Sequence, residues 1–129
     1  MDVVGPLLGA IGFVAGMSLV REPARREVNT ILVAGAAGAY LNGGFGAWEL
    51  VYPALGLVLA YRALRSYRYL GIAWLAHSGW DALHHLYGDP IWPFMATSSF
   101  GCLVFDAAIA TWFLADAPTF VRRRAAQRT

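Results

Sequence analysis

Long apolar stretches along the chain alternate with short polar segments that carry arginine. The apolar stretches cover residues 3–20, 29–46, 48–65, 69–87 and 93–115. As a helix, the first would measure roughly 27 Å, close to the hydrocarbon thickness of a bilayer. A glycine-rich turn at 42–46 separates the second stretch from the third, and Gly88-Asp89-Pro90 closes the fourth. The pattern predicts one all-α domain over residues 1–129, with five helices.

The composition predicts the environment of these helices. Of 129 residues, 58% are hydrophobic and only 14% are charged, and the mean hydropathy is +0.50. A domain surrounded by water usually carries about 25% charged residues. The chain is therefore predicted to be a polytopic integral membrane protein with five transmembrane spans. Its single cysteine, Cys102, excludes an internal disulfide.

All ten basic residues are arginines, and they fall into clusters at residues 21–26, 62–68 and 122–128. With five spans and the amino terminus outside, all three clusters lie on the cytoplasmic side, as the positive-inside rule requires. The carboxyl-terminal tail, 118–129, is then cytoplasmic, and the expected location is a bacterial inner (plasma) membrane. Four spans would put the tail on the opposite side from the first cluster. Flanking arginines predict contact with membrane lipids and no nucleic-acid partner.

Four glycines lie on one face of the first stretch: Gly5, Gly9, Gly12 and Gly16. Small residues at this spacing let helix backbones approach closely. We expect this face to pack against another helix, either within the chain or across a homodimer. Ala10 is expected to face lipid.

Six ionisable residues fall within the predicted spans: Glu49, His77, Asp81, His84, His85 and Asp106. An aspartate at the centre of a membrane helix costs about 2.5 to 3.5 kcal/mol even on lenient insertion scales. Such groups usually face the interior of the bundle and pair with one another.

The fourth stretch holds four of these residues on one helical face, because His77, Asp81, His84 and His85 fall within about 100° of one another at 3.6 residues per turn. Imidazole and carboxylate suit zinc, iron or manganese. Counting back from the turn at Asp89 places Asp106 near the level of His77, and Glu49 is expected near His84 and His85. The predicted metal ligands are His77, His84, His85 and Asp81. The predicted proton-transfer groups are Asp81, Asp106 and Glu49, and all six residues are expected to line one cavity that opens outward.

Several strings of the sequence resemble a known family. They are residues 29–36 (NTILVAGA), 40–44 (YLNGG), 61–68 (YRALRSYR), 77–90 (HSGWDALHHLYGDP) and 97–102 (TSSFGC). Together they are similar to the bacterial and fungal integral membrane family catalogued as domain of unknown function 6010. The resemblance implies a small polytopic membrane protein and supplies no activity.

Three classes of function remain open from the sequence. The first is a membrane metalloenzyme that acts on a lipid or another apolar substrate. The second is a metal-free acid–base isomerase or cyclase, because His77 and Asp81 beside Trp80 are weakly similar to the five-span sterol isomerases. The third is a non-enzymatic transporter or accessory membrane subunit. No P-loop, dinucleotide-binding or H-E-x-x-H motif is present.

Overall fold

The computed structural model describes residues 2–41 and 43–119. Within them the chain forms five α-helices and one 3-10 helix, and no β-strand. They are α1 (Val4–Leu19), α2 (Ala24–Ala37), η1 (Gly46–Leu50, the 3-10 helix), α3 (Val51–Ala63), α4 (Tyr67–Tyr87) and α5 (Ser98–Leu114). The predicted all-α fold is confirmed. Part of the predicted tail and the third arginine cluster lie outside the described residues.

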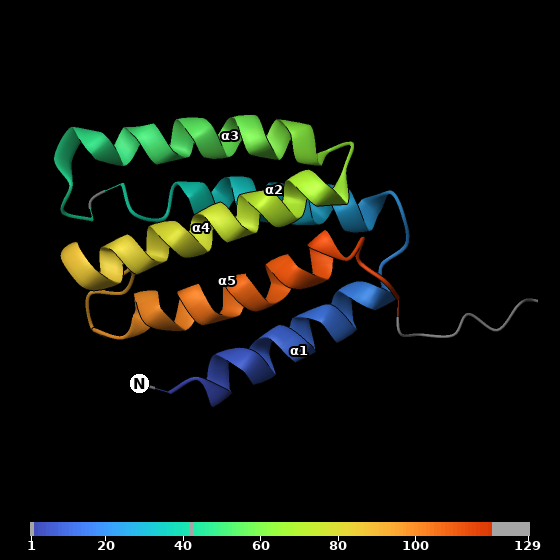
Figure 1. Cartoon of the computed structure of the whole chain (residues 1–129), viewed down its shortest axis with the longest axis horizontal. Coiled ribbons are helices and arrows are strands. Elements are labelled where there is room, and N and C mark those ends of the chain that lie inside the picture. The colour runs from blue at the N-terminus through green and yellow to red at the C-terminus, as the bar shows by residue number, and fades with distance from the viewer. Residues whose placement is uncertain (1, 42, 120–129) are drawn as a thin grey trace, which may run out of the picture.

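The five helices lie side by side with their axes roughly aligned (Figure 1). Helix α4 is central and packs against α2, α3 and α5, whereas α1 packs on the far side of α5. Among the residues that the structure describes, none of the helices combines the length with the apolar composition needed to cross a bilayer.

The helix ends differ most from the predicted stretches in α2 and α5. Helix α2 covers 24–37 instead of 29–46, so it includes part of the first arginine cluster. It can begin there because the Arg25 guanidinium is paired with Glu22 and Tyr67. Helix α5 begins at Ser98 instead of residue 93. Before it, the hydroxyls of Ser98 and Ser99 accept hydrogen bonds from the backbone of the connecting segment.

The predicted turn at 88–90 and the described part of the predicted turn at 42–46, residues 43–46, both separate helices as expected. Gly44 and Gly46 have φ of +102° and +57°, a conformation that side-chain-bearing residues rarely adopt. Gly43 needs its missing side chain for a different reason, because a Cβ there would lie 2.7 Å from Nε2 of His84. The α2–η1 connection thus passes directly over α4.

The prediction for the glycine face of α1 is wrong for packing within the chain. A Cβ added at Gly12 or Gly16 would meet nothing within 4 Å, and Gly9 approaches only Phe105. Ala10, expected to face lipid, is instead buried against α5. The bulkier side chains of Phe13 and Val14 share the packed side of α1, because they bury more apolar area than glycines can.

The buried stripe of α4 changes character along its length. Toward its amino-terminal end, Leu70, Ala73 and Trp74 join the apolar core with Ile109 and Phe113 of α5. One turn later the same stripe carries His77, Asp81 and His84, all 2% exposed or less. The polar half of this stripe positions the candidate site.

Candidate metal centre

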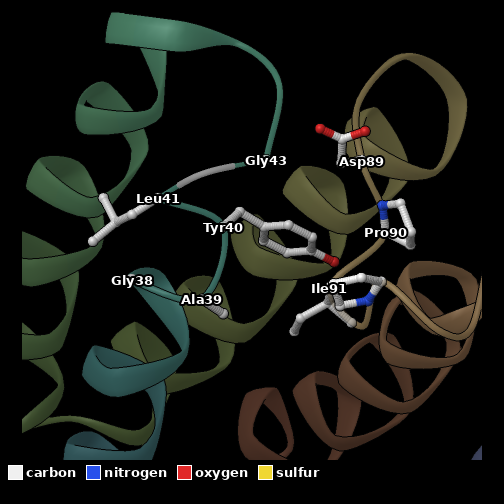
Figure 2. A pocket seen from close by; sticks show the side chains of 9 residues that line it. Gly38, Ala39, Tyr40, Leu41, Gly43, Asp89, Pro90 and Ile91 are labelled. Atoms are coloured by element: carbon white, nitrogen blue, oxygen red, sulfur yellow. The ribbon is translucent and has the colours of Figure 1, made fainter.

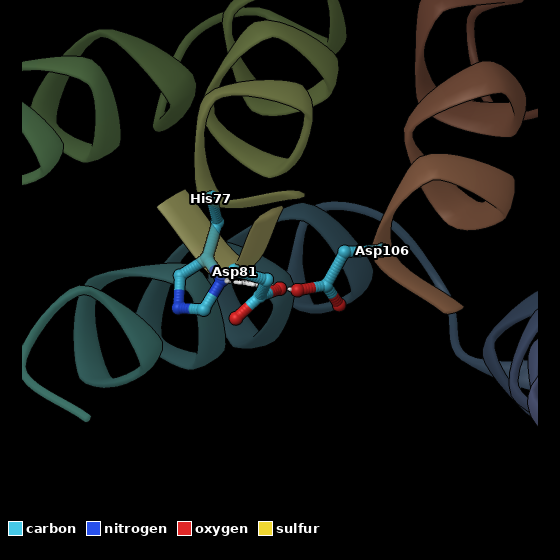
Figure 3. Close-up of side chains that lie close together, drawn as sticks. All are labelled: His77, Asp81 and Asp106. Atoms are coloured by element: carbon cyan, nitrogen blue, oxygen red, sulfur yellow. Dashed lines mark hydrogen bonds and ion pairs between the residues drawn. The ribbon is translucent and has the colours of Figure 1, made fainter. Parts of the chain in front are cut away.

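Three ionisable side chains meet between α4 and α5 (Figure 3). His77 and Asp81 come from successive turns of α4, and Asp106 comes from α5. Nδ1 of His77 lies 3.2 Å from Oδ2 of Asp81 and 3.1 Å from Oδ2 of Asp106. We call these three residues the histidine–carboxylate cluster. All three are buried, and Asp81 is completely excluded from the surface.

The register of α4 and α5 explains why these three side chains lie together. His77 and Asp81 are four residues apart, so they share one face of α4. The turn at Asp89 reverses the chain, and α5 runs back along α4. The predicted level of Asp106 beside His77 is confirmed by their 3.1 Å contact.

A third helix fixes the orientation of the His77 ring. Nε2 of His77 lies 2.7 Å from the carbonyl oxygen of Ala36, in the last turn of α2. A carbonyl only accepts hydrogen bonds, so Nε2 carries a proton and donates it. Nδ1 is then the nitrogen that faces both carboxylates. It can accept a proton from one of them, donate to both as an imidazolium, or bind a cation.

Tyr40 completes the surroundings of Asp81. Its hydroxyl donates to Oδ1 of Asp81 at 2.6 Å, which leaves Oδ2 directed at His77. No motif or spacing in the sequence marks Tyr40 as a functional residue. It lies after the end of α2, where no helical periodicity relates it to α4. The only sequence signal was its position next to the glycine-rich turn, in one of the strings quoted for the family resemblance.

The spacing of the histidine–carboxylate cluster is compatible with a single metal ion. One nitrogen and two carboxylate oxygens lie within 4.8 Å of one another. With bonds of about 2.1 Å, neighbouring ligand atoms lie about 3.0 Å apart in an octahedron and about 3.4 Å apart in a tetrahedron. The two distances from Nδ1, 3.1 and 3.2 Å, fall between these values.

His84 and Glu49 form a second buried pair, one helical turn beyond the cluster. Nε2 of His84 lies 3.1 Å from Oε1 of Glu49, and Nδ1 lies 3.0 Å from the carbonyl of Trp80. The backbone N–H of Phe45 also donates to Oε1 of Glu49. Among the described residues, Oε2 of Glu49 has no hydrogen-bond partner although it is buried. The predicted proximity of Glu49 to His84 is confirmed.

The structure separates the six predicted residues instead of gathering them around one cavity. The Tyr40 ring stacks on His84 with 3.8 Å between ring centroids and lies between the His84–Glu49 pair and the histidine–carboxylate cluster. His85 points elsewhere: it is half-buried and packs on Phe100 of α5, with ring centroids 5.5 Å apart. His84 and His85 are therefore not brought together with His77 as ligands of one ion.

A pocket of about 490 Å³ opens beside Tyr40. Figure 2 shows the Tyr40 ring pointing from the α2–η1 connection toward Asp89, Pro90 and Ile91. We call this the Tyr40 pocket; its wall is formed by residues 38–41, Gly43, residues 89–91 and Pro93. Tyr40 is its link to the cluster, because the same side chain lines the pocket and hydrogen-bonds Asp81.

A different polar group lies at the opposite end of α4. Nη2 of Arg25 lies 2.6 Å from Oε1 of Glu22, and Nε donates to the Tyr67 hydroxyl at 2.9 Å. The Tyr67 hydroxyl in turn donates to Glu22. We call these three residues the arginine network. Partial burial of Glu22 opposes its ionisation, but the hydrogen bonds from Tyr67 and Arg25 outweigh it and hold the pKa of Glu22 below its ordinary value.

Comparison with known proteins identifies the family. The sequence profile of the family of unknown function DUF6010 matches residues 1–119, and the chain belongs to this family. No curated protein and no solved structure matches the chain.

Proposed function

We propose that this member of DUF6010 is a small integral membrane protein whose histidine–carboxylate cluster binds one divalent metal ion. The observation that carries the proposal is the convergence of Nδ1 of His77 with carboxylate oxygens of Asp81 and Asp106, all buried. Mixed nitrogen and oxygen ligands suit zinc, iron or manganese.

Charge balance supports the proposal. With a neutral His77, the two carboxylates carry two negative charges into a buried site. A buried charge without a partner is strongly unfavourable, so the site requires two positive charges nearby. A divalent cation supplies both at the point where the three ligand atoms already meet.

The proposed membrane location rests on composition and on the surface. Large apolar side chains are exposed over all five helices, among them Leu19, Ile31, Leu57, Leu86 and Leu114. Soluble monomers rarely expose apolar area so widely. We propose five spans with the amino terminus outside and the carboxyl terminus in the cytoplasm. This orientation gathers the arginine clusters on one side.

The proposed substrate is a lipid or another apolar molecule that reaches the Tyr40 pocket. When bound, the ion would supply Lewis-acid chemistry. A molecule in the pocket that displaced Tyr40 would alter the hydrogen bond that Asp81 accepts, because the Tyr40 hydroxyl donates directly to this carboxylate. His84, which stacks on the Tyr40 ring, and its partner Glu49 would hold a proton near the pocket.

One observation favours a second candidate, a metal-free acid–base isomerase or cyclase of apolar molecules. Nδ1 of His77 lies within hydrogen-bond distance of two carboxylates, so two protons could balance the site instead of an ion. Such a group can exchange protons with a substrate without any cofactor.

Elemental analysis of the detergent-purified chain distinguishes the two candidates. We expect zinc, iron or manganese in the wild-type protein and in Asp116→Asn, which changes an exposed aspartate beyond the end of α5. Asp106→Asn should lose the metal, since it replaces a charged ligand by a neutral amide of the same shape. A wild-type protein that binds none of the three metals, even after incubation with each, would favour the metal-free site.

The orientation can be tested at the α4–α5 turn. Asp89 is exposed there, so Asp89→Cys in a Cys102→Ser background should react with an impermeant thiol reagent in intact cells. Labelling only after lysis would contradict the proposed orientation. Recovery of the chain apart from the membrane fraction would contradict the membrane location itself.

A further inference from the structure

A second cavity lies on the opposite side of α5 from the histidine–carboxylate cluster, where α1 packs against α5 (Figure 1). It has a volume of about 540 Å³. Its walls are almost entirely apolar, and they include Leu7, Ile11 and Val14 of α1 and Trp112 of α5. We call it the α1–α5 groove.

The dimensions of the groove match one lipid chain. Its lining extends along α1 from Leu7 to Ser18, about 16 Å of helix at 1.5 Å per residue. This is about half of the 30 Å hydrocarbon thickness, so in the proposed membrane orientation the groove spans one leaflet. Its Ser18 end lies toward the arginine cluster at 21–26, which places it in the inner leaflet.

The guanidinium of Arg25 lies at that end of the groove. Its Cζ is 5.8 Å from the ring centroid of Trp112, a residue that lines the groove. Nε donates to the Tyr67 hydroxyl and Nη2 donates to Glu22. Nη1 is buried and has no hydrogen-bond partner among the described residues. Leaving donors of a charged group unpaired in the interior is costly. An anionic group brought within reach of the Arg25 guanidinium would supply the missing acceptor and remove that cost.

From these observations we infer that the α1–α5 groove binds an acidic phospholipid of the inner leaflet, with an acyl chain along α1 and the phosphate at the end of the groove beside Trp112 and Arg25. The inference rests on the proposed membrane location but not on the proposed metal centre. The apolar walls account for the chain, and the unpaired guanidinium donors account for the headgroup. A free phosphate would leave the groove unexplained, and a zwitterionic lipid would bring its positive group to a site already rich in arginine.

The experiment is a lipid titration of the full chain after exhaustive detergent exchange, followed by native mass spectrometry. Phosphatidylglycerol and phosphatidylcholine with identical acyl chains are the two probes. We expect phosphatidylglycerol to bind about ten-fold more tightly, the effect of one hydrogen bond to a charged group. Inorganic phosphate at the same concentration should not compete.

Two variants and two controls test the two halves of the site. Arg25→Gln should abolish the preference for phosphatidylglycerol, whereas Arg65→Gln removes an exposed arginine elsewhere and should not. Ala15→Phe should fill the groove and weaken binding of both lipids without touching the arginine network. Ala54→Phe, on the exposed side of α3, is its matched control.

Several results would overturn the inference. They are equal binding of the two lipids by the wild type, a preference that survives Arg25→Gln, or binding unaffected by Ala15→Phe. Competition by inorganic phosphate would replace the phospholipid by a simple anion site. Dimerisation of the delipidated protein that Ala15→Phe prevents would make the groove an interface between copies. Metal content measured on the same samples shows whether the proposed metal centre stands independently.

Discussion

The histidine–carboxylate cluster and the arginine network are two solutions to placing charge between helices. In the arginine network, one guanidinium meets one carboxylate, and the Glu22 side chain remains 41% exposed to solvent. In the cluster, two carboxylates meet one imidazole, and no member is more than 6% exposed. The positive charge of Arg25 in the arginine network is balanced by Glu22, which also meets water. The charge of the cluster is balanced only when protons or a cation are added, and for this reason we place the proposed function there.

The largest expected difference between the two regions concerns the loss of one side chain from each. His77→Ala leaves two buried carboxylates facing each other and removes the donor to Ala36. Breaking a buried ionic group in this way costs about 3 to 5 kcal/mol. We expect a large drop in the thermal unfolding midpoint in detergent, and a much smaller one for Glu22→Gln. Similar midpoints for both variants would mean that the cluster is not under greater electrostatic strain than the arginine network.

Two tyrosines allow a matched comparison of hydroxyl groups. Tyr40→Phe removes the donor to Asp81, which is fully buried, and should cost about 1.5 to 3 kcal/mol. Tyr67→Phe removes the donor to the partly exposed Glu22, where water can replace it, and should cost less.

If the cluster holds a metal, Tyr40→Phe should also weaken metal binding about 10- to 100-fold, as loss of an orienting group around a ligand does. Titration of both variants with zinc and manganese checks this, and equal metal affinity in wild type and Tyr40→Phe would speak against Tyr40 as an orienting residue.

A glycine substitution extends the comparison to the His84–Glu49 pair. Gly43→Ala would place its Cβ 2.7 Å from Nε2 of His84, so the imidazole must move away from Glu49. Overpacking of this kind costs about 1 to 3 kcal/mol. Gly35→Ala, within α2 and with nothing within 4 Å of the added Cβ, should be neutral or slightly stabilising. Thermal unfolding of the two variants measures the difference, and two equal midpoints would show that the loop gives way without disturbing His84.

The smallest expected effect is the pH dependence of the arginine network. The pKa of Glu22 is lowered in the folded state, because the hydrogen bonds it accepts outweigh its partial burial. Its contribution to stability is therefore complete above the ordinary glutamate pKa of about 4.3 and is lost as the pH falls through the lower folded value. Glu22→Gln should flatten the acid limb of a plot of unfolding midpoint against pH and change little at pH 7. An unchanged acid limb would assign the acid sensitivity to other carboxylates.

The sequence predicted the parts of the site that depend on regular geometry. The four-residue spacing of His77 and Asp81 and the reversal at Asp89 are sufficient to bring Asp106 to the cluster, because helix rise and turn position determine the level of each side chain. Rotation about a helix axis is harder to predict. His85 lies within 40° of Asp81 on a helical wheel, yet it packs on Phe100 instead of joining the cluster.

Contacts set by the shape of a partner could not be predicted from one sequence. Which face of α1 meets α5 depends on how Ala10 and Phe13 fit the opposing surface, and the glycine pattern alone indicated the wrong face. Tyr40 reaches Asp81 from a segment outside any helix, so no periodic rule relates the two residues. The burial of Arg25 likewise depends on Tyr67, which is 42 residues away in the sequence.

The hydrogen bond from His77 to Ala36 has a thermodynamic consequence for the Tyr40 pocket. Ala36 lies two residues before the first residue of the pocket wall. Tyr40, which is part of that wall, donates a hydrogen bond to Asp81, so the same segment contacts the cluster at two points. A molecule in the pocket that shifts this segment changes the free energy with which the cluster binds protons or a metal ion. Thermodynamic linkage then requires the reverse effect: binding of protons or a metal ion at the cluster changes the affinity of the pocket for that molecule by the same factor. If the cluster binds a metal as proposed, ligands of the pocket can be ranked by the change in metal affinity that each produces, before any reaction is known.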